Sequence, residues 1–96
     1  MPTMLIVEDE LVLARNLAKA FAHWGFEVQH AASGADARRM ATTTQFDVAL
    51  LDLRLPDGSG LAVLDALIAA DPDLPVIMMT AYGSVAEAVS AMQRGA

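Results

Sequence analysis

One stretch of the sequence decides the fold: Val48-Ala49-Leu50-Leu51-Asp52-Leu53-Arg54-Leu55-Pro56-Asp57-Gly58-Ser59-Gly60-Leu61. An apolar run leads to Asp52, and a proline and two glycines then interrupt the chain within eight residues. A continuous apolar run bounded by turn residues is typical of a parallel strand that is buried on both faces. Such a strand delivers its last side chain to the carboxyl edge of the sheet. Asp52 is therefore the first candidate for a functional residue.

Composition favours one small domain, residues 1–96, of which 55% are hydrophobic. The absence of cysteine excludes disulfides and thiolate metal sites and agrees with a reducing cytosol. No apolar run approaches the roughly 18 residues that cross a bilayer, so we expect a cytoplasmic domain without a membrane segment. The net charge of −6 argues against a nucleic-acid surface, because phosphate backbones select basic patches.

Amphipathic segments with helix-capping residues predict four helices. In residues 10–24 large apolar side chains recur every four residues, and Gly25 follows as a stop signal. Ser33 and Asp36 have the spacing of a capping box, with Asp in place of the usual Glu or Gln. The predicted helices are residues 10–24, a short helix from Ser33 to the run Thr42-Thr43-Thr44, residues 60–70, and a helix that Ser84 caps and Gly95 ends.

Four apolar runs alternate with these helices and predict four strands. Residues 4–7 stop abruptly at an acidic run, and residues 47–52 end at Asp52. Residues 26–31 alternate apolar and polar side chains, as in an edge strand, whereas residues 76–79 do not alternate and are expected to be buried on both faces. This alternation of strands and helices favours an α/β sheet of parallel strands with right-handed crossovers.

Polar side chains follow three of the predicted strands. Open α/β sheets bind ligands beyond the carboxyl ends of their strands, where Glu8, Asp9, Asp52 and Thr80 are expected. Three carboxylates without a basic partner repel one another, so either some stay protonated or a hard cation bridges them. Mg²⁺ accepts carboxylates, a backbone carbonyl and waters, and it keeps an open position for a substrate oxygen. We therefore expect Mg²⁺ at this edge.

A metal beside a carboxylate and a hydroxyl suits phosphoryl transfer. The cation neutralises the phosphoryl oxygens while the carboxylate of Asp52 attacks in line. Thr80 would then bind an oxygen of the acyl phosphate and draw the loop Ala81-Tyr82-Gly83 inward. This geometry predicts a switch.

Each of these residues also has a simpler interpretation. Acids after a strand are often solvated loop residues or helix N-caps, and a lone Asp at a strand end is commonly a turn former. Thr80 alone could be a cap, and Asp57-Gly58 is interpreted as only a turn. His23 and His30 lack partners at metal-ligand spacing and are interpreted as structural or surface residues. The joint occurrence of acids after the first strand, Asp after the third and Thr after the fourth is hard to obtain by accident.

These residues, in this order, resemble the receiver domain of two-component response regulators. The resemblance covers the whole chain and implies a flavodoxin-like sheet of strand order 2-1-3-4. In that topology the first helix lies on one face of the sheet and the following helices lie on the other. The matching stretches are Leu5-Ile6-Val7-Glu8-Asp9-Glu10, residues 47–60 and Val76-Ile77-Met78-Met79-Thr80-Ala81.

The resemblance also implies roles for individual residues. Asp52 would accept a phosphoryl group from the phosphohistidine of a sensor histidine kinase, which makes the domain a signalling acceptor and not an enzyme. Around Mg²⁺ it implies the carboxylates of Glu8, Asp9 and Asp52 and the backbone carbonyl of Arg54. Thr80 would be the switch hydroxyl, small Ala81 would leave the phosphoryl site accessible, and Tyr82 would lie in the loop that moves. The sequence around these last residues is most similar to receivers of transcription activators.

The family pattern departs from this sequence after Gly95-Ala96, where a fifth strand carrying a lysine and a fifth helix usually follow. The one lysine, Lys19, lies within the first predicted helix. We therefore expect the fifth βα unit to be missing, with impaired phosphorylation and switching. We also expect self-association through the exposed edge of the strand at residues 76–79 and the uncovered sheet face beside it.

Other functional classes remain open at this point. The chain could be an interaction or dimerisation module that is not phosphorylated and whose acids are remnants. A magnesium phosphohydrolase with an Asp nucleophile typically has a second Asp two residues further on, where this chain has Arg54. Dinucleotide binding is disfavoured because the first turn carries acids in place of a glycine-rich phosphate loop.

Overall fold

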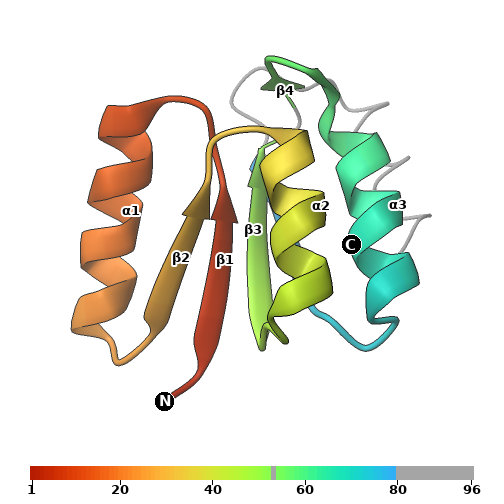
Figure 1. Cartoon of the computed structure of the whole chain (residues 1–96). Coiled ribbons are helices and arrows are strands. Elements are labelled where there is room, and N and C mark those ends of the chain that lie inside the picture. Colours follow the sequence, from red (N-terminus) through yellow and green to blue (C-terminus); the bar gives the residue numbers. More distant parts are fainter. Residues whose placement is uncertain (53, 80–96) are drawn as a thin grey trace.

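A parallel β-sheet with helices on both faces forms the part of the chain that the structure describes (Figure 1). The computed structural model describes residues 1–52 and 54–79. The elements are β1 (Thr3–Val7), α1 (Leu11–His23), β2 (Glu27–Ala31), α2 (Gly34–Thr43), β3 (Val48–Asp52), β4 (Arg54–Leu55), β5 (Gly58–Ser59), α3 (Gly60–Ala70) and β6 (Val76–Met79). The main sheet has the order β2-β1-β3-β6 with parallel neighbours. This confirms the predicted order 2-1-3-4, with β6 as its fourth strand.

The two faces of the sheet carry separate cores. Leu5, Val7 and Leu51 point toward α2 and α3, and they pack with buried residues such as Leu64. The alternate residues of the same strands, including Ile6, point toward α1. Figure 1 shows α1 on one side of the sheet and α2 and α3 on the other, as the strand order requires when the chain reverses direction after β2. The helix predicted between Ser84 and Gly95 lies outside the described residues.

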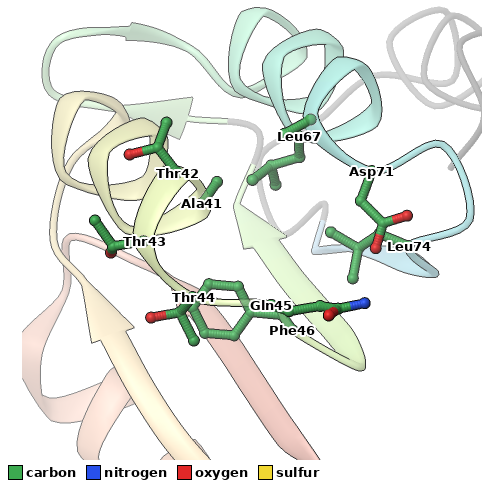
Figure 2. A pocket seen from close by; sticks show the side chains of 10 residues that line it. Ala41, Thr42, Thr43, Thr44, Gln45, Phe46, Leu67, Asp71 and Leu74 are labelled. Atoms are coloured by element: carbon green, nitrogen blue, oxygen red, sulfur yellow. The ribbon is translucent and has the colours of Figure 1, made fainter.

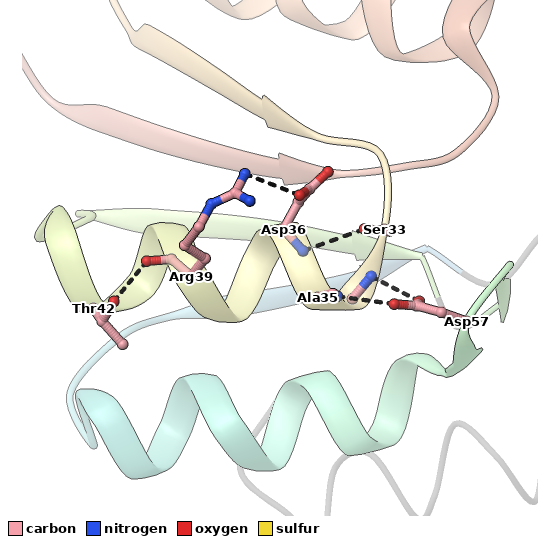
Figure 3. Close-up of polar contacts among 7 residues, drawn as sticks. Ser33, Ala35, Asp36, Arg39, Thr42 and Asp57 are labelled. Atoms are coloured by element: carbon pink, nitrogen blue, oxygen red, sulfur yellow. Dashed lines mark hydrogen bonds and ion pairs between the residues drawn. The ribbon is translucent and has the colours of Figure 1, made fainter.

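Local signals mark the end of α1 and the start of α2, as the sequence predicted. Gly25 follows α1 with φ of 96°, a backbone conformation that residues other than glycine rarely adopt. Ser33 Oγ accepts a hydrogen bond from the backbone N–H of Asp36 (3.2 Å), which confirms the predicted cap of α2 (Figure 3). The carboxylate of Asp36 forms an ion pair with Arg39 (2.9 Å).

The predicted burial of residues 76–79 on both faces is wrong. Val76 is buried, but the side chain of Ile77 is 54% exposed. Ile77 lies on the α1 side of the sheet, because its register partner Leu50 belongs to the core on that side. Since α1 packs against β2 and β1, it leaves this part of β6 uncovered. The lack of alternation between apolar and polar residues in this strand therefore did not indicate burial on both faces.

A small hairpin that the sequence analysis did not predict follows β3. Strands β4 and β5 pair antiparallel, with Arg54 opposite Ser59 and Leu55 opposite Gly58. Pro56 and Asp57 form the turn between them, so Asp57 is a turn residue, as interpreted from the sequence. Within residues 1–52 and 54–79, none of the helices combines the length and apolar character needed to cross a membrane.

We predict that Leu64→Ala destabilises the fold by about 2–5 kcal/mol, the range for truncating a fully buried leucine. Leu64 is fully buried in α3, and alanine preserves helix propensity, so the loss would come from the cavity. Chemical denaturation followed by circular dichroism measures this change. Leu11→Ala is the matched control, because Leu11 is 54% exposed at the start of α1. Equal losses in the two variants would contradict the burial described above.

Candidate functional site

The pairing of β1 with β3 brings the predicted acids together. Val7 pairs with Leu51, so the residues that follow these two in the chain, Glu8 and Asp52, reach the same edge of the sheet. Glu8, Asp9 and Asp52 each place one carboxylate oxygen within 4.8 Å of the other two. The structure thus assembles three of the predicted side chains at the carboxyl edge.

The remaining predicted site residues are not all described. Thr80, Ala81 and Tyr82 lie outside the described residues. Arg54 begins β4, two residues beyond Asp52, so its backbone lies close in the chain to the acids. Its carbonyl remains a predicted ligand.

The three acids differ in their access to solvent. Glu8 is buried, with 3% of its surface exposed, Asp52 is half-buried, and Asp9 is exposed. The cluster therefore extends from the interior at Glu8 to solvent at Asp9. A ligand that approached from solvent would meet Asp9 and Asp52 while Glu8 closed the inner side.

Hydrogen bonds hold the backbone of Glu8 against the end of β2. Its N–H donates to the carbonyl of Ala31 (3.0 Å), and its own carbonyl accepts a hydrogen bond from His30 Nε2 (2.7 Å). A carbonyl oxygen can only accept, so Nε2 carries the proton in this contact. The side chain of Glu8 is fixed as well, because Oε1 accepts from the N–H of Glu10 (3.1 Å).

His30 is a residue whose contact the sequence analysis missed. It is exposed, as its interpretation as a surface residue suggested, but its ring also supports the backbone of a site residue. His30 and Glu8 are 22 residues apart, so no local spacing could reveal the contact. The parallel register of β1 and β2 creates it, since this register pairs His30 with Ile6 near the end of β1.

Burial raises the pKa of the Glu8 carboxyl from 4.5 to about 7. The backbone N–H of Glu10 opposes this rise in pKa, whereas the neighbouring Asp52 adds to it through a hydrogen bond and its charge. The sequence left two ways to relieve the repulsion among the carboxylates, protonation or a bridging cation. Protonation of Glu8 is thus the way that is available without a cation. A bound cation would favour the ionised form instead.

The donor set fits a hard cation. Carboxylate oxygens are preferred ligands of Mg²⁺ and Ca²⁺. Two oxygens bound to one Mg²⁺ at about 2.1 Å lie at most roughly 4.2 Å apart, so oxygens within 4.8 Å need little movement to share an ion. Glu8, Asp9 and Asp52 are therefore suited to hold Mg²⁺ together.

A pocket of about 420 Å³ lies at the opposite edge of the sheet, between the ends of α2 and α3 (Figure 2). Its floor includes the buried side chains of Phe46, Leu67 and Leu74. The hydroxyls of Thr42 and Thr43 on its rim donate to backbone carbonyls of α2. These polar groups are satisfied within the chain, so the pocket gives no indication of a ligand.

The raised pKa of Glu8 predicts a pH-dependent effect of Glu8→Gln. The pKa of Glu8 in the folded state, about 7, lies above the usual 4.5. Protonated Glu8 therefore contributes its full stability to the fold below pH 4.5, and this contribution is lost as the pH rises through 7. The loss is at most about 3.5 kcal/mol, because a difference of one pKa unit corresponds to about 1.4 kcal/mol. The variant cannot ionise at this position and should gain stability relative to wild type between pH 5 and pH 8.

Thermal unfolding at both pH values, without divalent cations, measures this difference. Glu27→Gln is the control, since Glu27 is exposed at the start of β2. A difference between Glu8→Gln and wild type that stays constant from pH 5 to pH 8 would show that the buried carboxyl does not titrate in this range.

Comparison with known proteins shows which regulatory proteins the chain resembles. The acid tolerance regulatory protein ActR of Rhizobium meliloti is 42% identical over 94 residues, which are 98% of this chain and 48% of ActR. The transcriptional regulatory protein PrrA of Mycobacterium leprae is 38% identical over 95 residues, which are 99% of this chain and 41% of PrrA. The chain thus spans about half the length of the curated relatives that it matches.

Structural similarity agrees with these matches. A response regulator from Burkholderia pseudomallei, solved with a phosphorylated aspartic acid, a calcium ion and citrate, superposes with a TM-score of 0.95 at 31% identity. The match covers 100% of this chain and 56% of that one. The sequence model of the response regulator receiver domain family matches residues 4–96 of this chain. With its flavodoxin-like sheet and its acids at the carboxyl edge, the chain belongs to the receiver domains of two-component response regulators.

Proposed function

We propose that this domain, residues 1–96, accepts a phosphoryl group on Asp52 from the phosphohistidine of a sensor histidine kinase in the cytoplasm. The observation that carries the proposal is the convergence of Glu8, Asp9 and Asp52 at one edge of the sheet in a chain of the receiver family. The phosphorylated aspartic acid in the similar Burkholderia protein supports the same type of modification.

Asp52 is suited to act as the nucleophile because it is half-buried at the end of β3 and borders on an exposed residue, Asp9. One of its oxygens would attack phosphorus in line as the bond from phosphorus to the donor imidazole breaks, and the imidazole would take the electron pair. Glu8, Asp9, Asp52 and the carbonyl of Arg54 would hold Mg²⁺, which supplies neutralisation of the phosphoryl oxygens.

Thr80 is proposed to read the modified state. Its hydroxyl would donate a hydrogen bond to an oxygen of the acyl phosphate, with Ala81 leaving space and Tyr82 moving with the loop. The relatives named above are regulatory proteins, and PrrA is named a transcriptional regulator. We propose that this receiver likewise controls transcription, without itself binding nucleic acid, given its net charge of −6.

The proposal predicts that a small acyl phosphate and Mg²⁺ add one phosphoryl group to the chain at Asp52. Intact-mass and fragment-mass spectrometry would locate the modification, and Asp52→Asn should abolish it. Asp9→Asn should slow modification on the order of tenfold or more through weakened metal binding. Asp73→Asn is the matched control, because Asp73 is an exposed acid in the loop before β6, at the opposite edge of the sheet.

The same experiment tests the alternative that the chain is an interaction module without phosphorylation. Modification at another residue would refute Asp52 as the acceptor. No modification, together with amide spectra that do not respond to Mg²⁺, would favour the interaction module.

A second proposed property is self-association through β6. This strand is an edge of the described sheet, and the side chain of Ile77 within it is 54% exposed. An exposed strand edge offers unpaired backbone groups to another chain, and an apolar side chain beside it strengthens the contact.

Sedimentation analysis should therefore detect dimers or larger species at high protein concentration. Ile77→Lys should shift the population toward monomer, because a charged side chain on an edge strand disfavours pairing. Leu11→Lys is a matched control, since Leu11 is also 54% exposed but lies on α1. A compact wild-type monomer at every concentration would contradict this property.

A further inference from the structure

Asp57 makes a contact that a turn residue does not require. It lies at the tip of the β4–β5 hairpin, and its two carboxylate oxygens reach the start of α2 (Figure 3). Oδ1 accepts a hydrogen bond from the N–H of Gly34 (2.9 Å), and Oδ2 accepts one from the N–H of Ala35 (2.9 Å). Residues more than 20 positions apart in the sequence are thus joined by one carboxylate.

The contact completes the cap of α2. The first N–H groups of a helix have no partner within the helix, and Ser33 Oγ serves only that of Asp36. Asp57 serves the two preceding N–H groups, those of Gly34 and Ala35. A carboxylate at a helix N-terminus is favoured by the helix dipole and by charge-assisted hydrogen bonds. In agreement, these two N–H groups lower the pKa of Asp57 below 3.8.

The packing at this contact leaves no room for a side chain at position 34, the first residue of α2. A Cβ atom at position 34 would lie 3.1 Å from Asp57 Oδ1 and 2.8 Å from Cγ2 of Val63. Glycine therefore lets the hairpin and α3 approach the first residue of α2 together. The contact is a junction of three elements, α2, the hairpin and α3.

The junction is connected to the acidic cluster through the hairpin. Strand β4 begins at Arg54, two residues after Asp52, and it pairs with β5, which follows Asp57 directly. Leu55 also packs against the core on this side of the sheet. A hairpin tied at its tip by Asp57 has a fixed backbone at its base, where the proposed carbonyl ligand of Arg54 lies.

We infer that Asp57 is a positioning residue, which anchors the β4–β5 hairpin to α2 and so fixes the backbone of Arg54 for metal binding beside Asp52. The inference rests on the proposed function for the role of Arg54. Asp57 is not a member of the acidic cluster, and both of its oxygens accept hydrogen bonds from backbone N–H groups of α2.

Two alanine variants separate positioning from simple helix capping. Asp57→Ala removes the hairpin anchor and part of the cap of α2, whereas Ser33→Ala removes another part of the same cap and leaves the hairpin anchored. Both should lower the midpoint of thermal unfolding by a few degrees. Titration calorimetry with Mg²⁺ should show affinity lowered on the order of tenfold in Asp57→Ala and unchanged in Ser33→Ala. Asp57→Asn keeps one acceptor oxygen and should be intermediate.

Amide hydrogen exchange of β4 provides a test that needs no metal. Asp57→Ala should accelerate exchange of the β4 amides, and Ser33→Ala should not. The inference would be overturned if both alanine variants bound Mg²⁺ as tightly as wild type, or if both lost the same affinity for Mg²⁺. Unchanged amide exchange of β4 in Asp57→Ala would overturn it as well. If wild type binds no Mg²⁺, the proposed function fails, while the exchange rates still decide whether Asp57 anchors the hairpin. If Asp57→Ala does not fold, Asp57→Asn is compared with Ser33→Ala in both measurements.

Discussion

The parallel register of β1 with β3 is the constraint on which the site depends. Val7 and Leu51 are register partners, and both are fully buried on the side of α2 and α3. A slip by one residue would turn these side chains to the other face of the sheet, so the core itself fixes the register. Since Glu8 and Asp52 follow these two residues, their meeting is a consequence of hydrophobic packing.

This arrangement places a carboxyl group where its charge is disfavoured. Burial is the main cause that raises the pKa of Glu8 to about 7, and the neighbouring Asp52 contributes to the same rise. The hydrogen bond that the N–H of Glu10 donates to Oε1 of Glu8 offsets part of this cost. Buried acids with perturbed pKa values are characteristic of functional sites, because folding alone gives no reason to keep them.

Much of the fold follows from patterns within short stretches. The bounds predicted for residues 60–70 and 76–79 agree with α3 and β6, because apolar spacing and flanking Gly or Pro residues report local geometry directly. The convergence of the acids also followed, since it requires only that parallel strands end at one edge. The exposure of Ile77 did not, because it depends on where α1 packs. The contacts of His30 and Asp57 reach across 22 or 23 residues and have no local signal.

Two aspartates of the stretch at residues 48–61 show how environment determines the chemistry of a residue. Asp52 lies beside the carboxyl groups of Glu8 and Asp9, so negative charge accumulates around it and a cation becomes a favourable partner. Asp57, five positions later, meets two backbone N–H groups that use both of its oxygens. One stretch thus supplies both the proposed phosphoryl acceptor and the proposed anchor of the chain beside it, and only the tertiary structure distinguishes them.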